Sequence, residues 1–371
     1  MNIITSPPDQ KTIGVAIAGL GFGEKVHLPA LYKNKNLNPV ALWHPREARL
    51  KTACDKYHLK GHQNWSNIIN DPQIDAIIIA TPPEIRYELA IEALSAGKHL
   101  LLEKPVAITS DEIISIQKLA LRNRLSVAVD FEYRAVPIFM QLKNMLDKNI
   151  IGTPWLIKLD WLMSSRADES RAWNWYSEST KGGGVIGALG THAFDLLHWL
   201  FGETRSVTGK TVTAIRNRPF HSENQLKEVT SEDICLAQLE MSGISSDLHL
   251  PAQVTLSSVS RNGRGCWLEI YGSQGSLILG SDNQKDYVHG FSLWLAEKGK
   301  KIVSIKAEKE LLFDKTWEDG RIAPVARVQS WWSNSIIHRT PMIPGLTEGL
   351  LSQKVCERIK ESSSSKMTLS L

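Results

Sequence analysis

Cysteine is scarce in this chain, with four residues among 371. Cys54, Cys235, Cys266 and Cys356 lie far apart and show none of the close spacings that bind zinc or form redox pairs. We therefore expect idle, reduced thiols, a cytoplasmic protein and no metal site.

Long apolar runs and a strong excess of one charge are also missing. No stretch approaches the ~18 consecutive apolar residues of a membrane-spanning helix. The first eleven residues hold no apolar signal-peptide core and contain Pro7 and Pro8, so residues 1–11 are expected to be a disordered lead-in. The formal net charge is only +4, which gives no reason to expect nucleic acid or a membrane as a partner.

The first third of the chain alternates short apolar runs with helical patterns. The runs are rich in β-branched and aliphatic residues, as in strands that are buried on both faces of a parallel sheet. Such alternation is typical of right-handed βαβ units, so we predict an α/β fold with a doubly wound parallel sheet over residues 12–132. The expected strands are 12–18, 39–43, 75–80, 98–102 and 126–129.

A glycine turn follows the first expected strand, where a dinucleotide fingerprint would lie. Gly19 would make the turn, and Gly21 would let the backbone approach a pyrophosphate at the helix N-terminus. Phe22 and Gly23 complete the predicted cofactor contacts of this turn. The third position of the fingerprint carries Glu24, so either the turn shifts at Gly23 or Glu24 points away from the phosphates. A purely structural turn is the alternative.

The end of the second strand bears on the choice of cofactor. An acidic residue there would bind the adenosine ribose of NAD. The sequence instead has His44 and Arg46, with Arg49 nearby. Because an acid is missing and a base is present, we assign His44 and Arg46 to a 2′-phosphate and expect NADP in preference to NAD. The alternative is that Arg46 and Arg49 form the solvated face of a helix.

Two further strand ends supply candidate site residues. Ala80, Thr81 and Pro82 end the third strand, at the edge of the sheet where a cofactor would lie. Glu103 and Lys104 end the fourth. A lysine at the exit of a buried strand can lose water and shift its pKa, and it then serves as a charge partner or proton donor.

Four pieces occur in order along the chain: Gly19-x-Gly21, Ala80-Thr81-Pro82-Pro83, Ala96-Gly97-Lys98-His99 with Glu103-Lys104-Pro105, and the segment from Gly182 to Asp195. Together they resemble the family of glucose–fructose oxidoreductase, inositol dehydrogenase and the rhizopine-catabolism oxidoreductases. The resemblance extends from about Thr12 to Ser362. It implies a Rossmann domain followed by a C-terminal α/β domain over residues 133–362, with a large, mostly antiparallel open sheet that forms a homodimer or homotetramer. It also implies that Lys104 contacts substrate and nicotinamide, and that the Lys104-Pro105 bond is often cis.

The segment after the triple glycine 182–184 carries the expected acid–base chemistry. His192 and Asp195 are three residues apart on a predicted helix and share one face. We expect Asp195 to hold one imidazole nitrogen, which leaves His192 free to take a hydroxyl proton. The family usually has an aspartate four residues before this histidine, but this chain has Ala188. A weaker base, a different substrate and lost catalysis all remain open.

Three other residues are predicted to contact the substrate together with His192. Trp175 lies in a loop that roofs the substrate site in the family, although a core or interface role is the alternative. Tyr133 and Arg134 begin the second domain, near the expected crevice. Arg134 would bind a carboxylate or cofactor phosphate, or else form an interdomain salt bridge.

The sequence thus predicts an NAD(P)-dependent oxidoreductase that transfers a hydride between nicotinamide and a sugar, polyol or related hydroxy or carbonyl compound. One alternative is a reductase of a non-sugar carbonyl or a tetrapyrrole, as biliverdin reductases of this fold are. Another is a non-catalytic, cofactor-sensing regulator. Residues 363–371 are expected to form a frayed tail.

Overall fold

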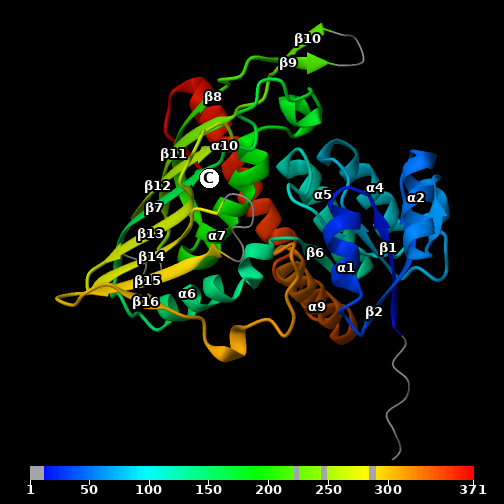
Figure 1. Cartoon of the computed structure of the whole chain (residues 1–371), viewed down its shortest axis with the longest axis horizontal. Helices are drawn as coiled ribbons and strands as arrows, with labels where there is room; N and C mark the ends of the chain where they lie inside the picture. Colours follow the sequence, from blue (N-terminus) through cyan, green and yellow to red (C-terminus); the bar gives the residue numbers. More distant parts are fainter. Residues whose placement is uncertain (1–11, 221–224, 244–248, 284–289) are drawn as a thin grey trace, which may run out of the picture.

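The computed structural model describes residues 12–220, 225–243, 249–283 and 290–371. The expected lead-in at residues 1–11 lies outside them. Figure 1 shows two bodies side by side: the first third of the chain forms a sheet flanked by helices, and the middle of the chain forms a broad, twisted sheet with helices on its inner face. Among the helices of the described ranges, none is long and apolar enough to cross a membrane.

The first sheet confirms the predicted parallel fold. Its six strands pair in the order β3-β2-β1-β4-β5-β6, and every pair is parallel. The edge strand β3 was not predicted, because its sequence Lys60-Gly61-His62 is short and lacks apolar residues. The strands are β1 (Ile13–Ala18), β2 (Leu37–Trp43), β3 (Lys60–His62), β4 (Ala76–Ile79), β5 (His99–Leu102) and β6 (Val127–Val129).

Both faces of this sheet are covered, which explains the continuous apolar runs. Alternate residues of β1 enter two different cores, with Ala16 and Ala18 in one and Val15 and Ile17 in the other. The covering elements are a π-helical turn η1 (Gly23–His27) that continues into α1 (Leu28–Leu31), then α2 (Glu47–Tyr57), α3 (Trp65–Ile69), α4 (Pro83–Ser95) and α5 (Ser110–Asn123).

Two helices from the end of the chain return to the first domain. Helix α9 (Ile322–His338) places Val328 and Trp332 in the same core as Ile17. Helix α10 (Leu346–Ser365) contacts α5 and β6 on one side and α7 (Thr191–Phe201) and β8 (Thr204–Val212) on the other. The N-terminal core is therefore completed by residues some 200 positions downstream of its last strand.

The second sheet has nine strands in the order β16-β15-β14-β13-β7-β12-β11-β8-β17. Only β7 and β12 pair in parallel; the other pairs are antiparallel. This confirms the mostly antiparallel sheet. Besides β8, the strands are β7 (Pro154–Leu162), β11 (Ile234–Met241), β12 (Leu250–Ser257), β13 (Gly265–Gly272), β14 (Gly275–Ser281), β15 (Ser292–Glu297), β16 (Val303–Ile305) and β17 (Leu369–Ser370).

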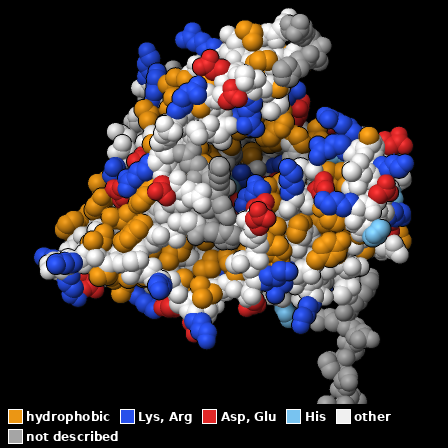
Figure 2. Space-filling view, in the orientation of Figure 1, with side chains coloured by type: hydrophobic (Ala, Val, Ile, Leu, Met, Phe, Trp, Pro, Cys, Tyr) orange, Lys and Arg blue, Asp and Glu red, His pale blue; other side chains and the backbone are white. Residues whose placement is uncertain are grey.

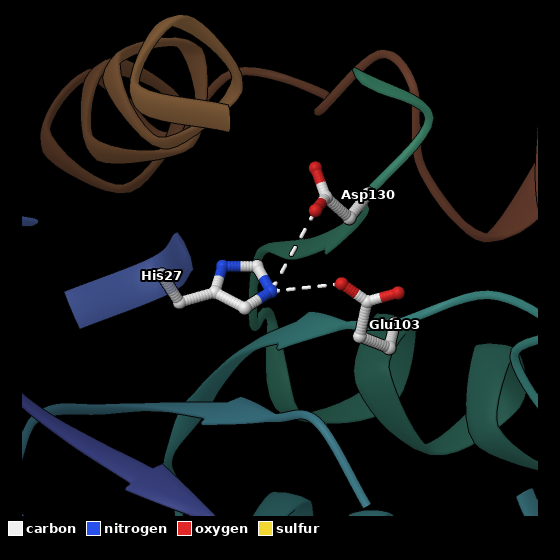
Figure 3. Close-up of side chains that lie close together, drawn as sticks. All are labelled: His27, Glu103 and Asp130. Atoms are coloured by element: carbon white, nitrogen blue, oxygen red, sulfur yellow. Dashed lines mark hydrogen bonds and ion pairs between the residues drawn. The ribbon is translucent and has the colours of Figure 1, made fainter. Parts of the chain in front are cut away.

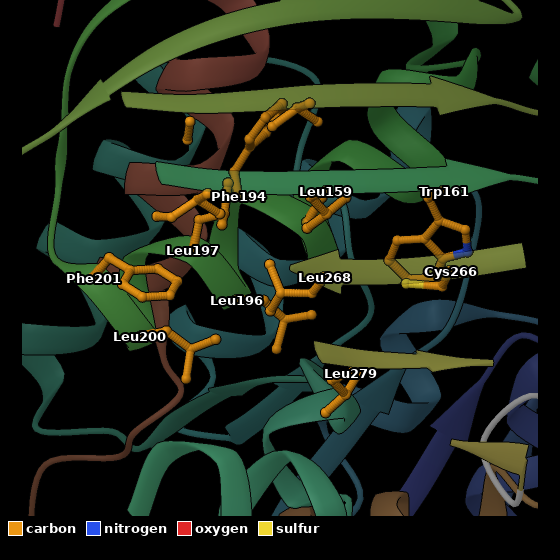
Figure 4. Close-up of a cluster of buried hydrophobic side chains, with 14 of the residues drawn as sticks. Leu159, Trp161, Phe194, Leu196, Leu197, Leu200, Phe201, Cys266, Leu268 and Leu279 are labelled. Carbon is orange, nitrogen blue, oxygen red and sulfur yellow. The ribbon is translucent and has the colours of Figure 1, made fainter. Parts of the chain in front are cut away.

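One face of this sheet packs against α6 (Pro137–Asp147) and α7. Figure 4 shows the resulting core, in which Leu268 of the sheet lies beside Leu196 of α7, and Trp161 lies beside Cys266. The other face is open, and Leu156 and Leu236 are exposed there. A separate hairpin of β9 (Asn217–Phe220) and β10 (Gln225–Glu228) projects beyond the sheet (Figure 1).

The prediction of a frayed tail was wrong. Helix α10 continues to Ser365, and β17 adds to the edge of the second sheet by pairing with β8. The hydroxyl groups of Thr368 and Thr208 lie 2.7 Å apart, and the Ser362 hydroxyl donates to the carbonyl of Met367. The tail is ordered because the edge of β8 offers it unpaired backbone groups.

Candidate functional site

A cavity of about 630 Å³ lies between the two domains, at the carboxyl ends of the strands of the first sheet. Figure 2 shows the surface hollowed there, with Lys and Arg side chains at its rim. The cavity brings together all but one of the predicted cofactor residues; only Gly23 does not line it. Those that do are Gly19, Gly21, Phe22, His44, Arg46, Ala80, Thr81, Pro82, Glu103 and Lys104.

The glycine turn forms a cradle that fits a pyrophosphate. Gly19 has a φ of +98°, and a Cβ there would lie 2.6 Å from the carbonyl oxygen of Ala80. A Cβ on Gly21 would meet nothing within 4 Å, so this backbone faces open space in the cavity. Gly23 instead lets η1 pack on β1, because an added Cβ would lie 2.8 Å from Ile17. Glu24 does not line the cavity.

The end of β2 presents bases and no acid to the cavity. His44, Arg46 and Arg49 all line it. The backbone N–H of Arg46 donates to Nδ1 of His44 at 3.0 Å, and the Arg49 guanidinium donates to the Leu20 carbonyl at 3.0 Å. Burial, with added repulsion from the two arginines, lowers the pKa of His44. Through its hydrogen bond to Leu20, Arg49 connects the start of α2, just after this strand end, to the glycine turn.

Lys104 reaches across the cavity to the second domain. Its Nζ donates to the carbonyl oxygen of Ala188 at 3.2 Å, and the Lys104-Pro105 peptide is cis, as the resemblance implied. The buried guanidinium of Arg86 holds this loop by donating to the carbonyls of Glu103, Pro105 and Thr81. The lysine thus stands on a fixed turn.

Behind this turn is a buried cluster of His27, Glu103 and Asp130, shown in Figure 3. His27 Nε2 lies 2.9 Å from a Glu103 oxygen and 3.6 Å from an Asp130 oxygen. Burial acts to raise the pKa of Glu103, but His27 and Lys104 bring it below its ordinary value. Burial and the neighbouring carboxylate of Glu103 raise the pKa of Asp130 well above its ordinary value. Glu103 is therefore the ionised member, beside Lys104.

The predicted pairing of Asp195 with His192 was wrong. Both carboxylate oxygens of Asp195 accept from Arg134, at 2.8 and 2.7 Å. Burial nevertheless raises the pKa of Asp195 to about 6. His192 and Asp195 do share a helix face. The Asp195 carboxylate nevertheless binds the guanidinium of Arg134, which belongs to another element, the 3-10 turn η2 (Glu132–Ala135).

Tyr133 and Arg134 do not line the cavity, contrary to their predicted substrate contacts. The turn η2 directs both side chains into the second domain, where each is at least nine-tenths buried. The Tyr133 ring meets the His192 ring edge-on, with centroids 4.9 Å apart. Arg134 forms its salt bridge with Asp195 within the second domain rather than between domains.

His192 lines the cavity from α7 as predicted, but its carboxylate neighbour is Glu132. Its Nε2 lies 3.6 Å from a Glu132 oxygen. Burial and the charge of Lys104 lower the pKa of His192 well below its ordinary value, so the ring is neutral at physiological pH. Ala188 also lines the cavity, so the position of the family's usual aspartate faces the site without a carboxylate.

The cavity is also lined by residues that the sequence did not predict, among them Glu132, Arg321 and Tyr176. Glu132 lies three residues after the end of β6, so the rule that strand ends line the crevice could have found it. Arg321 precedes α9, stacks on Phe22 at 5.2 Å and pairs with Asp319, and no local pattern signals it. Tyr176 lies beside Trp175, which lines the cavity as expected of a roof residue.

Comparisons with known proteins agree with this geometry. Residues 13–131 match the model of an oxidoreductase family described as an NAD-binding Rossmann fold, and residues 143–371 match that of the family's C-terminal alpha/beta domain. An uncharacterized oxidoreductase of Synechocystis is 41% identical over 350 residues, which cover 94% of this chain and 93% of the relative.

A second relative carries a named activity. Levoglucosan dehydrogenase of Pseudarthrobacter phenanthrenivorans is 27% identical over 301 residues, covering 76% of this chain and 77% of the enzyme. A solved structure of levoglucosan dehydrogenase in complex with NADH and L-sorbose superposes with a TM-score of 0.87 at 20% identity, over 97% of this chain and 98% of that one. At this identity the superposition shows the fold alone. By its two family matches, this chain belongs to the oxidoreductase family of glucose–fructose oxidoreductase, inositol dehydrogenase and the rhizopine-catabolism proteins.

Proposed function

We propose that this protein is an NAD(P)-dependent dehydrogenase or reductase that interconverts a hydroxyl and a carbonyl group on a sugar, polyol or related compound. The observation that carries the proposal is the position of the Lys104 ammonium, which lies in one cavity with the glycine cradle and His192. Levoglucosan dehydrogenase, with its NADH and sugar complexes, supports the substrate class.

The chain's own residues bind and orient the reactants. Gly19 and Gly21 would hold the pyrophosphate, and the nicotinamide would supply hydride transfer. Lys104 would donate to the reacting oxygen and stabilise its alkoxide character in the transition state. Trp175 would pack against the C–H face of a sugar ring. His192 would hydrogen-bond the same oxygen through a neutral imidazole, because burial and Lys104 disfavour its charged form.

The basic end of β2 supports NADP as the preferred cofactor. Three cavity-lining bases, His44, Arg46 and Arg49, surround the place where the adenosine ribose is expected. Among the described residues, the two carboxylates that line the cavity, Glu103 and Glu132, follow β5 and β6, so neither stands at the end of β2. A 2′-phosphate would be attracted to such a group of bases.

The same proposal includes a homodimer or homotetramer that forms through the second sheet. Its open face carries exposed apolar side chains, among them Leu156, Leu236 and Tyr271. A second copy would cover this apolar surface. Sedimentation of the purified protein tests this part, and a monomer at micromolar concentration would contradict it.

Cofactor titration followed by a substrate screen tests the activity. NADPH and NADH are titrated separately while nicotinamide fluorescence is recorded, and sugars and polyols are then screened for turnover. We expect tighter binding of NADPH and turnover of at least one compound. Lys104→Ala should abolish most of this turnover, whereas Lys118→Ala, at an exposed position of α5, should not. Failure to bind either cofactor would contradict the proposal.

A non-catalytic, cofactor-sensing regulator is the second candidate, and the missing carboxylate at Ala188 favours it. Cofactor binding without turnover on a broad panel would support this reading. The presence of both Lys104 and His192 in the cavity counts against a regulator, because cofactor sensing needs only the glycine turn that holds the pyrophosphate.

A further inference from the structure

Glu132 brings a carboxylate to a cavity that is also lined by the imidazole of His192 and the ammonium of Lys104. It follows β6, is only 6% exposed and lines the cavity beside Lys104 and His192. One of its oxygens lies 3.6 Å from Nε2 of His192, slightly too far for a hydrogen bond. A substrate hydroxyl held by Lys104 would therefore find an acceptor in the same corner of the site.

The other acidic side chains near the reacting centre are already engaged. Within the described residues, Glu103 and Glu132 are the only carboxylates that line the cavity. Glu103 is bonded to His27 at 2.9 Å and sits behind the turn that carries Lys104. Asp195 gives both oxygens to Arg134, and residue 188 has no carboxylate. Glu132 is left as the acid of the reacting centre.

Charges from every surrounding element act on Glu132. Burial is the largest influence and raises its pKa to about 7, helped by the negative charge of Glu103. Lys104 from the end of β5 opposes this rise, as does Arg321, which approaches from the segment before α9. His192 on α7 is neutral, and Asp130, two residues before Glu132, is buried with a pKa well above its ordinary value. A carboxyl that titrates near physiological pH can both take and return a proton.

We propose that Glu132 is the proton acceptor of this site: in the oxidation direction it takes the proton of the substrate hydroxyl. The inference rests on the proposed dehydrogenase function. In that step the carbinol C–H bond breaks, and its hydrogen leaves with both bonding electrons as a hydride that the nicotinamide would accept. The O–H bond breaks and its proton passes to the carboxylate of Glu132, while the carbon–oxygen bond becomes a carbonyl. Reduction reverses each transfer. The substrate is oxidised and the nicotinamide is reduced.

His192 becomes a positioning residue in this scheme. Its ring is held edge-on by Tyr133 and lies between α7 and the carboxylate. As a neutral group it can orient the hydroxyl and the Glu132 oxygen without keeping the proton. Glu132 thus supplies, from the segment after β6, the carboxylate that the chain lacks at position 188 in the turn before α7.

Infrared difference spectroscopy tests the protonation of Glu132 without any substrate. Spectra of the full-length protein are recorded from pH 5 to pH 9 for the wild type and for Glu132→Gln. We expect the wild type to show a protonated-carboxyl band that is missing in the variant and that disappears with a midpoint of about 7. In Lys104→Met the midpoint should move to higher pH, because the ammonium favours the ionised form. A carboxyl fully ionised at pH 5 would overturn the proposal.

The pH profile of turnover tests the proton transfer itself. With a polyol that the wild type oxidises, kcat should rise as pH increases through the titration of Glu132. Glu132→Gln should lose at least ~100-fold in kcat and lose this pH dependence. Glu132→Asp should recover part of the rate, and Glu88→Gln on the exposed face of α4 should behave as the wild type.

The outcomes separate the two proposals. If the wild type oxidises a substrate and Glu132→Gln keeps both its rate and its pH profile, the role of Glu132 is refuted while the dehydrogenase function stands. If the wild type turns over no compound of the panel, the proposed function fails and the proton-acceptor role fails with it.

Discussion

Replacing Glu132 by glutamine should stabilise the protein, and more so at pH 8 than at pH 5. The pKa of Glu132 is raised from 4.5 to about 7 in the folded protein, mainly by burial. Between these values the unfolded chain releases a proton that the folded protein keeps. The wild type therefore loses stability as pH rises through this window, and loses little more above it. Glutamine has the same shape and does not titrate.

The size of the effect follows from the two pKa values. With about 1.4 kcal/mol for each pKa unit, ionisation of Glu132 costs the folded state about 1 kcal/mol at pH 5 and about 3 kcal/mol at pH 8. The advantage of Glu132→Gln in the free energy of unfolding should thus grow by about 2 kcal/mol between the two conditions.

Urea unfolding followed by tryptophan fluorescence measures this difference, with both proteins studied at both pH values. Glu88→Gln serves as the control, because Glu88 is exposed on α4 and its replacement should shift stability little at either pH. The same advantage at pH 5 and pH 8, or a larger one at pH 5, would refute the reasoning. It would mean that Glu132 is ionised in the folded protein at acidic pH.

Three further predictions concern other residues. Lys104→Ala should lower turnover at least ~100-fold in a steady-state assay, since an ammonium that stabilises alkoxide character is lost; near-normal turnover would remove it from the mechanism. Asp195→Asn leaves the buried guanidinium of Arg134 without a counter-charge and should cost about 3–5 kcal/mol in urea unfolding, and a loss below about 1 kcal/mol would show that the pair is solvated. Arg46→Ser should weaken NADPH binding about tenfold, or about 1.4 kcal/mol, with little change for NADH; an equal loss for both cofactors would contradict a 2′-phosphate contact.

The sequence predicted the parts of the site that depend on strand ends. In a parallel sheet the carboxyl ends of strands meet at one edge, so the glycine turn, His44, Thr81 and Lys104 could be brought together without knowing any long-range contact. The repetition of apolar strands and helical patterns identified the parallel sheet for the same reason. Of the six strands, only β3 was not predicted, because an exposed edge strand need not be apolar.

The parts that were missed depend on tertiary contacts. The spacing of His192 and Asp195 gives a shared helix face, but it says nothing about Arg134, which arrives from η2 and binds the carboxylate first. The carboxylate beside His192 was expected along the same helix, but the one that lies 3.6 Å from its Nε2 is Glu132, which follows β6. Arg321 reaches the cavity only because the chain returns to the first domain at α9.

That return of α9 has a consequence for how the protein forms during synthesis. The sheet of the first domain is complete by Val129, yet Val328 and Trp332 fill part of its core. Once Val129 has emerged from the ribosome, the nascent chain therefore exposes all six strands while an apolar face of their sheet is still uncovered. We expect that nascent chain to need protection until residue 338 has emerged, and the isolated N-terminal segment to aggregate rather than serve as a working nucleotide-binding module.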